Sequence, residues 1–304
     1  MLASILSLGL LGIEGFVVTT EVNLAPGMPA FDVVGLPDAA VKESRERVRA
    51  ALRNSGYAFP NGRLVVNLAP ADQKKEGPAF DLPIALGVLA CAGEIEAQAL
   101  GQTAVLGELS LDGAVRSVRG ALPMVISALE AGIGRVMLPE SNLNEVRCVE
   151  GIELLGVSHL KDAVAHFTGK SPISPIVPVQ YAELLSRREH SVDFCHVRGQ
   201  KSAKRALEIA AAGGHNVLMI GPPGSGKTLM ARCLPTILPD MTFQEALEVT
   251  RIHSVAGCVP ETGLLTERPF RSPHHTASHA ALVGGGANAL PGEISKAHNG
   301  VQLN

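Results

Sequence analysis

The sequence has 304 residues, of which 46% are apolar, 18% are charged and 3% are aromatic, with a formal net charge of −3. This hydrophobic content excludes a largely disordered chain, because disorder requires low hydrophobicity together with high net charge. The charge also excludes a uniformly basic nucleic-acid scaffold, although it is compatible with a local basic patch. At roughly 100–200 residues per domain, the length indicates two domains. The abundance of small and aliphatic residues favours packed α/β layers.

The cysteines and the first residues bear on where the protein resides. The five cysteines are widely spaced and form no C-x-x-C motif, which indicates reduced thiols in a cytoplasmic protein rather than a disulfide framework or a zinc site. No stretch reaches the ~18 uninterrupted apolar residues of a membrane span, so we expect no membrane partner. The apolar start, Leu2 to Ile13, lacks the positive region and cleavage site of a signal peptide. We therefore expect a buried first strand there.

Residues 1–168 alternate between strand-like and helix-like patterns, which predicts a mixed α/β domain. Short apolar or β-branched runs predict strands at residues 13–24, 30–35, 63–68, 104–109, 135–138 and 152–157. Helices are expected between them at residues 38–55, 82–92 and 121–131.

A proline-rich stretch follows this region. Pro172, Pro175 and Pro178 are three residues apart, a spacing that favours extended chain, so residues 169–190 are predicted to be an interdomain linker.

Residues 191–304 form the second predicted domain. We expect a helix at 201–212, a short strand at 216–220, a glycine-rich turn and a helix to about Leu234. Thr242 and Glu245 have the spacing of a capping box and predict the start of a further helix. The last forty residues are rich in Gly, Pro and His and predict mostly loops.

The glycine-rich turn matches the phosphate-binding pattern G-x-x-x-x-G-K-[ST] in full. It consists of Gly221, Pro222, Pro223, Gly224, Ser225, Gly226, Lys227 and Thr228. Glycines let backbone N–H groups approach phosphate oxygens, and Lys227 supplies a charge to the β- and γ-phosphates. The Thr228 hydroxyl is the expected ligand of a Mg²⁺ ion that accompanies ATP. Nucleotide binding, with ATP and Mg²⁺ as cofactors, is the strongest functional prediction from the residues themselves.

Several longer strings point to a family. Residues 193–200 (D-F-C-H-V-R-G-Q) resemble the segment that opens AAA+ ATPase modules and packs near the adenine, with His196 where an acidic residue is usual. Residues 268–276 (R-P-F-R-S-P-H-H-T), 284–286 (G-G-G) and 291–301 (P-G-E-I-S-K-A-H-N-G-V) closely resemble magnesium chelatase-like AAA+ proteins of the ComM/YifB type. Strings such as G-L-P-D at 35–38 and V-N-L-A-P-A-D at 66–72 extend the resemblance through nearly the whole chain.

This resemblance implies an α/β fold class: a Lon-protease-like (ribosomal S5 domain 2-like) domain followed by the N-terminal part of a P-loop AAA+ domain. It also implies assembly as a homo-hexamer and ATP-driven branch migration of DNA in recombination and natural transformation. DNA is therefore an expected partner.

The first domain resembles the Lon protease domain but lacks its catalytic pair. In the stretch K-E-G-P-A, Ala79 stands where the Lon nucleophilic serine is found, and Leu122 stands at the position of the catalytic lysine. A Ser–Lys dyad needs a hydroxyl to attack and an amine to take its proton. We therefore expect no peptidase activity.

Two weaker signals carry competing interpretations. Lys42, Arg45, Arg49 and Arg53 share one side of the predicted helix at 38–55, where they form either a DNA contact or a solvated, salt-bridged face. Because Glu46 lies among the cations and Glu43 is placed to pair with Arg47, we favour the solvated face. His274, His275 and His279 suggest a metal site, but no further ligand accompanies them, and a loop facing the pore of an AAA+ ring is expected instead.

In the resembled family, A-H-N-G-V continues as an apolar strand that ends in the Asp-Glu pair of the Walker B element. Here Val301 is followed by Gln-Leu-Asn, so this sequence is expected to stop before Walker B, the sensor residues and the arginine finger. Phosphoryl transfer depends on such positioned charges. We therefore expect ATP binding with little or no hydrolysis, and no catalytic residue is assigned.

The leading prediction is an ATP-binding AAA+ protein of the ComM/YifB type that acts on DNA. Three alternatives remain: a protein-remodelling or protease-associated ATPase, a non-enzymatic nucleotide-binding fragment, and a metal chelatase subunit. The fused Lon-like domain argues against the last of these.

Overall fold

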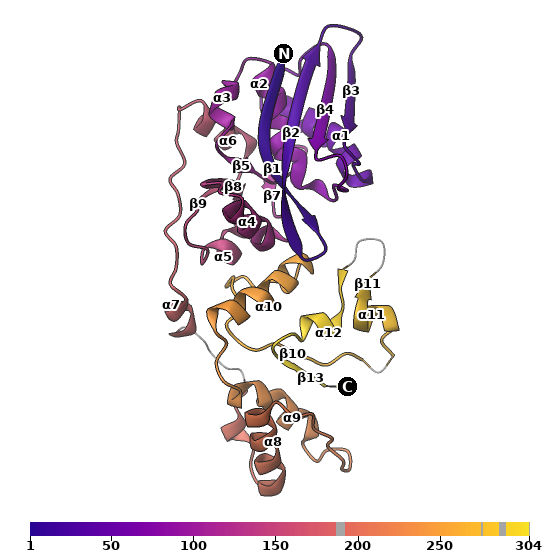
Figure 1. The fold of residues 1–304 in the computed structure, drawn as a ribbon, viewed down its shortest axis with the longest axis vertical. Coiled ribbons are helices and arrows are strands. Elements are labelled where there is room, and N and C mark those ends of the chain that lie inside the picture. The colour runs from indigo at the N-terminus through magenta and orange to yellow at the C-terminus, as the bar shows by residue number, and fades with distance from the viewer. Residues whose placement is uncertain (187–191, 275, 286–289, 304) are drawn as a thin grey trace. The chain divides into compact units, whose positions relative to one another are not determined.

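The computed structural model describes residues 1–186, 192–274, 276–285 and 290–303 (Figure 1). The chain divides into unit 1, which comprises Met1–Pro178 and Glu261–Gly263, and unit 2, which comprises Val179–Pro260 and Leu264–Asn304. The change from one unit to the other after Pro178 lies within residues 169–190. The domain limits 1–168, 169–190 and 191–304 stay a prediction.

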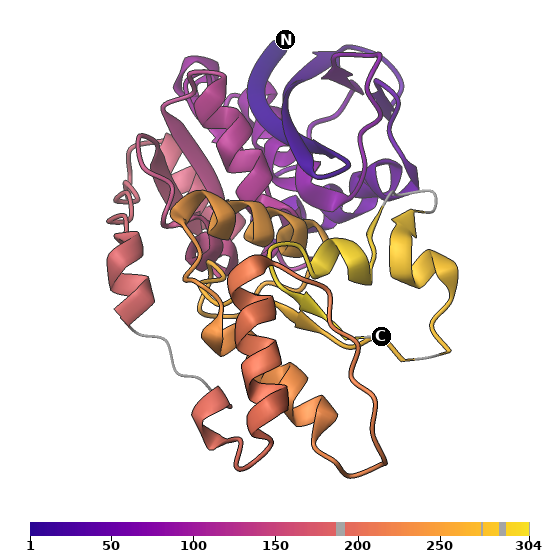
Figure 2. The same cartoon turned by 60° about the horizontal axis from the view of Figure 1, so that its bottom comes forward.

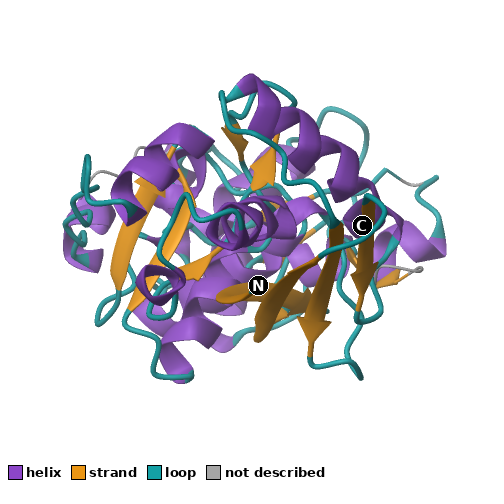
Figure 3. Cartoon of the chain, turned by 90° about the horizontal axis from the view of Figure 1, so that it is seen from above, coloured by secondary structure: helices purple, strands orange, loops and turns teal. Residues whose placement is uncertain are grey.

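Unit 1 is built on a mixed seven-stranded sheet with the order β3-β4-β2-β1-β5-β8-β9 (Figure 3). The pairs β1–β2 and β2–β4 are antiparallel, and the other four pairs are parallel. The bounds are β1 Leu2–Leu11, β2 Glu14–Ala25, β3 Ala30–Val34, β4 Arg63–Ala69, β5 Ala104–Val105, β8 Arg135–Pro139 and β9 Glu153–Val157. Gly12 turns the chain between β1 and β2 with φ +63°, a left-handed conformation that glycine adopts without strain.

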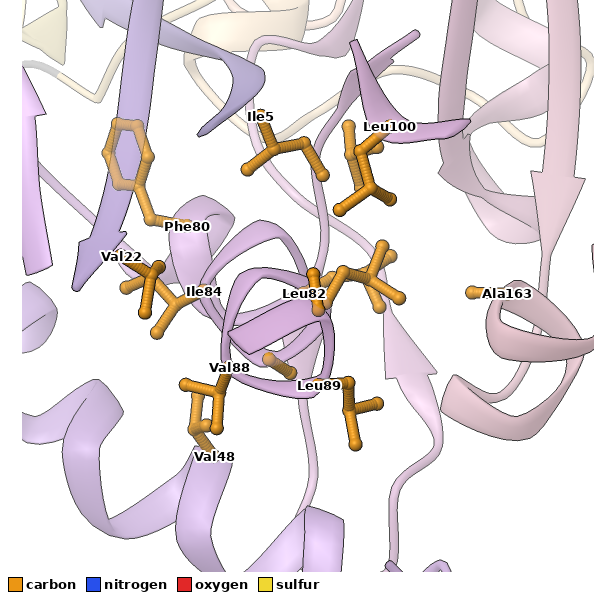
Figure 4. Close-up of a cluster of buried hydrophobic side chains, with 14 of the residues drawn as sticks. Ile5, Val22, Val48, Phe80, Leu82, Ile84, Val88, Leu89, Leu100 and Ala163 are labelled. Carbon is orange, nitrogen blue, oxygen red and sulfur yellow. The ribbon is translucent and has the colours of Figure 1, made fainter. Parts of the chain in front are cut away.

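The core of unit 1 lies around a completely buried helix, α2. All of its residues, Asp81–Cys91, are buried, and they pack against side chains from the sheet and from α1. Figure 4 shows Ile5 of β1, Val22 of β2 and Val48 of α1 around this helix. The helices of unit 1 are α1 Ala39–Asn54, α2, α3 Ala97–Leu100, α4 Ala121–Glu130, α5 Leu143–Val146 and α6 Leu160–Phe167.

One predicted strand of unit 1 is divided in the structure. Residues 104–109 form β5 in the large sheet and a separate strand, β6 (Glu108–Leu109), which pairs with β7 (Val115–Arg116). Between them the backbone N–H of Gly107 donates to the carbonyl of Ala79 at 2.9 Å instead of to a neighbouring strand. The prediction of one continuous strand is wrong, because apolar character alone does not say which backbone partner each residue finds.

Unit 2 consists of helices and two short two-stranded sheets. Its helices are α7 Tyr181–Ser186, α8 Lys201–Gly213, α9 Lys227–Cys233, α10 Phe243–Val255, α11 His279–Val283 and α12 Glu293–Lys296. β10 (Phe270–Arg271) pairs with β13 (Val301–Gln302), and β11 (Gly284–Gly285) pairs with β12 (Leu290–Pro291). The predicted capping box is confirmed: the Glu245 N–H donates to Thr242 Oγ1 at 3.2 Å, and the Thr242 N–H donates to Glu245 Oε2 at 2.7 Å.

Among the described residues, none of the helices combines the length and the hydrophobicity that crossing a bilayer requires.

Candidate nucleotide-binding site

The segment that leads into the glycine-rich loop, residues 216–220, has no regular secondary structure (Figure 2). The strand predicted here is therefore wrong. Leu218 and Ile220 are 85% and 88% exposed, and no strand in the described part of the chain pairs with this segment. A strand needs a neighbour that takes its backbone hydrogen bonds, and a run of apolar residues does not supply one.

The loop at residues 221–228 depends on glycine for its turns. Gly224 and Gly226 have φ values of +78° and +85°, in the left-handed region where a side chain would be strained. A Cβ atom at Gly221 would lie 3.1 Å from the Ser225 hydroxyl oxygen, so the chain also approaches itself closely there. Gly226 is the N-cap of α9, which begins at Lys227. The loop therefore has the strand-free entry and the helical exit described above, with glycines at its turning points.

The ammonium group of Lys227 lies against the loop itself. Its Nζ atom donates to the carbonyl oxygens of Gly221 at 2.8 Å and Pro222 at 2.9 Å, and lies 3.4 Å from the Ser225 hydroxyl. These three oxygens surround the positive charge as phosphate oxygens would. A phosphate that enters the loop therefore exchanges with the loop carbonyls for the same cation.

A cavity of about 370 Å³ opens between α8 and the loop. This volume lies within the range of small-molecule sites. Its wall is mostly apolar, with Gln200 and Lys227 as its longer polar side chains. The lining residues are Gln200, Ala203, Ala206, Leu207, Val217, Leu218, Met219, Ile220, Gly221, Pro222, Ser225, Lys227 and Met230. The contribution of α8 was not anticipated from the sequence; the small residues at positions 203 and 206, on one side of a predicted helix, were the available signal.

The predicted phosphate-loop residues divide between the cavity wall and its surroundings. Gly221, Pro222, Ser225 and Lys227 line the cavity, whereas Pro223, Gly224, Gly226 and Thr228 do not. Thr228 is exposed on the first turn of α9, so its hydroxyl is free of the protein core. The structure thus fits the requirements for nucleotide and Mg²⁺ at this loop.

The segment at 193–200 folds against the helix that follows the loop. The Asp193 carboxylate accepts a hydrogen bond from the Cys195 N–H at 2.7 Å and caps a short 3₁₀ turn, Phe194–His196. Phe194 packs in a small core with Leu207 and Met230, both of which also line the cavity. The segment therefore ends at the cavity with Gln200, while His196 is exposed.

The arginines of the R-P-F-R string hold unit 2 together. Arg268 donates to the carbonyl oxygens of Pro239 at 2.7 Å and Asn299 at 2.8 Å, and its guanidinium lies 3.3 Å from the Glu245 carboxylate. Arg271 pairs with Glu293 at 2.7 Å. Both side chains are engaged within the unit and act as structural ties.

The histidine prediction is met only in part by the described residues. His274 Nδ1 lies 2.7 Å from the Thr276 hydroxyl, and His279 begins α11. His275 and Gly286 lie outside the described residues. Among the residues that the structure describes, no group of three metal-ligating side chains is found.

The Lon-like stretch of unit 1 is buried. Ala79 and Leu122 are 9% and 0% exposed. Lys75, which is also fully buried, directs its ammonium to the backbone carbonyls of Pro70 and Gln73, and burial lowers its pKa. Lys75 thus acts as a loop tie in this stretch. The absence of peptidase activity stays a prediction.

Comparison with known proteins decides the family. The family described as magnesium chelatase, subunit ChlI, matches residues 193–303, and the family described as subunit ChlI of Mg-chelatase matches residues 20–142. The protein YifB of Escherichia coli is 44% identical over 292 residues, covering 96% of this chain and 56% of YifB. The competence protein ComM of Haemophilus influenzae is 42% identical over 302 residues, covering 99% of this chain and 59% of ComM. The chain belongs to the magnesium chelatase-like proteins of the ComM/YifB type.

The family assignment confirms the fold class predicted from the sequence. A weaker similarity to a Lon protease of Lachnoclostridium phytofermentans, 25% identical over 166 residues and covering 51% of this chain and 20% of that protease, agrees with the Lon-like character. The chain spans somewhat over half the length of the ComM/YifB-type relatives that it matches.

Proposed function

We propose that residues 221–228 bind the phosphates of ATP and that Thr228 completes the site as a ligand of Mg²⁺. The observation that carries this proposal is the position of the Lys227 ammonium, held by three loop oxygens beside a cavity of about 370 Å³. The bound Mg²⁺ would neutralise phosphate charge. The protein's own groups would bind and orient the nucleotide: Lys227 by its charge, the loop by its N–H groups, and the apolar wall by excluding water from the rest of the ligand.

The test is binding of a fluorescent ATP analogue to the chain and to Lys227→Ala. We expect saturable binding that is lost in the variant, because the cation that faces the phosphates is removed. Lys204→Ala serves as the matched control, since Lys204 is a lysine of α8 whose ammonium caps the Val197 carbonyl at 3.1 Å outside the loop. Unchanged binding by Lys227→Ala would contradict the proposal.

For the whole protein, we propose an ATP-driven role on DNA in a cytoplasmic hexamer, as the ComM/YifB-type resemblance implies. ComM carries the name competence protein, which supports a link to DNA uptake. The expectation of slow ATP hydrolysis by residues 1–304 stays a prediction, and phosphate release measured on the same samples tests it.

A protein-remodelling ATPase is the second candidate, favoured by the Lon-like character of unit 1. Stimulation of the full-length protein's ATPase by unfolded protein rather than by DNA would select it.

A further inference from the structure

The helix α1 separates its charges between two sides. Arg47 lies on one side, where its guanidinium bonds to Asp81 and also feels Glu43 and Glu108. The four other cations of the helix, Lys42, Arg45, Arg49 and Arg53, are exposed and span about 80° of a helical wheel on a different side. We call these four residues the α1 basic ridge.

The acidic groups near α1 leave this ridge largely uncompensated. Asp81 and Glu43 pair with Arg47, and Asp32 on the neighbouring β3 pairs with Arg63. Only Glu46 pairs with a ridge residue, Arg45, at 3.1 Å. Their side chains are 54% and 67% exposed, and such surface pairs exchange partners at little cost. For Lys42, Arg49 and Arg53, the described residues give no ion pair.

The ridge is held rigidly on the core. Val41, Val48 and Leu52 anchor the opposite side of α1 in the core of unit 1, and Asp38 caps the helix by accepting from the Val41 N–H at 2.7 Å. The Arg49 guanidinium lies 5.2 Å from the centre of the Phe59 ring, which limits its motion. An arginine stacked in this way still presents N–H donors at its rim.

The spacing of the ridge suits a row of phosphates. Arg45, Arg49 and Arg53 follow one another every four residues, so they rise about 6 Å each and about 12 Å in all. Duplex DNA presents a regular, dense array of negative charges, about one per 1.7 Å of helix axis. A rigid linear row of guanidinium groups matches such an array better than it matches a flexible acidic peptide, since the arginine fork donates to phosphate oxygens in fixed geometry.

We propose that the α1 basic ridge is a docking surface for the phosphate backbone of duplex DNA. This reverses the interpretation of a purely solvated, salt-bridged face that the sequence favoured. It adds a contact surface to the DNA role proposed above. It is independent of nucleotide binding at residues 221–228, which Lys227→Ala tests separately.

The experiment measures binding of a labelled duplex to the full chain by fluorescence anisotropy across a salt series. The test variant is R45Q/R49Q/R53Q. The matched control, R116Q/R119Q/K161Q, makes the same charge change at exposed cations elsewhere in unit 1. For three lost phosphate contacts, we expect the log–log salt slope of the test variant to fall by about 2–3, with a loss of roughly tenfold or more in affinity at low salt.

Equal losses in the test and control variants, or duplex binding too weak to measure in the unchanged chain, would overturn the proposal. Loss of binding to a labelled single strand alone would overturn the assignment to duplex DNA. R45K/R49K/R53K keeps the charges, so it should retain most of the affinity and the fold. Circular dichroism of all variants separates lost binding from lost folding.

Discussion

Arg47 and Asp81 form a buried ion pair between α1 and α2. Arg47 Nε donates to Asp81 Oδ2 at 2.6 Å, and its Nη2 donates to Oδ1 at 2.9 Å. The Asp81 side chain is fully buried, and it also accepts from the Leu109 N–H at 3.2 Å. The pair thus fixes the position of the central helix relative to α1 and to the β6 strand.

Replacing Arg47 with Met should strongly destabilise unit 1, because it leaves the Asp81 carboxylate buried without its cation. We expect a loss of about 3–5 kcal/mol in the free energy of unfolding. Urea titration followed by far-UV circular dichroism measures it. Arg63→Met is the matched control, since Arg63 pairs with Asp32 at the surface and should change stability by less than about 1 kcal/mol. Similar values for the two variants would contradict the role of the buried pair.

The same carboxylate should make stability depend on pH. Burial raises the pKa of Asp81 to about 6, although Arg47 favours its ionised form. Between the unfolded and folded pKa values, the folded state binds more protons at this site, so its contribution to stability is present at low pH and decreases as the pH rises from about 4 to 6. Asp81→Asn should flatten this part of the stability profile. An identical pH profile for the variant would argue against the raised pKa.

Loss of the Thr242 cap should weaken α10. Thr242→Ala removes the acceptor for the Glu245 N–H and should cost about 1 kcal/mol. Thr242→Ser keeps the hydroxyl and should cost much less. Thermal unfolding of the three proteins decides the matter, and equal destabilisation by Ala and Ser would show that the methyl group, not the cap, matters.

Residues 216–220 should tolerate polar substitution. Because Leu218 and Ile220 are almost fully exposed, Leu218→Ser and Ile220→Ser should each change the free energy of unfolding by less than about 0.5 kcal/mol. Val249→Ser, at a buried position of α10, is the contrasting variant and should cost far more. A loss of about 2 kcal/mol or more at residue 218 or 220 would mean that the segment is packed as a strand after all.

Local signals in the sequence were enough to predict several elements. Helix α1 begins after the predicted cap Asp38 and ends before Gly56, and α10 begins at its capping box, because these features act over three or four residues. The glycine conformations of the 221–228 loop follow from the same local chemistry. Pairings between distant residues were not accessible in this way.

The Arg47–Asp81 pair joins residues far apart in the sequence, and Glu43 was the only partner that helical spacing indicated for Arg47. That weaker contact does exist, at 4.0 Å. The strand expected at 216–220 failed for a related reason: strand formation depends on a partner that the segment itself does not encode. The wall that α8 gives to the cavity likewise arises only when the chain folds back on the loop.

The internal bonds of Lys227 make the phosphate loop its own competitor. The Gly221 and Pro222 carbonyls and an incoming nucleotide seek the same ammonium, so the affinity measured is the difference between two sets of contacts. A change that loosens the carbonyl contacts without touching the cation should therefore tighten nucleotide binding. The loop is in this sense pre-loaded, and its selectivity for phosphate depends as much on what must be released as on what is gained.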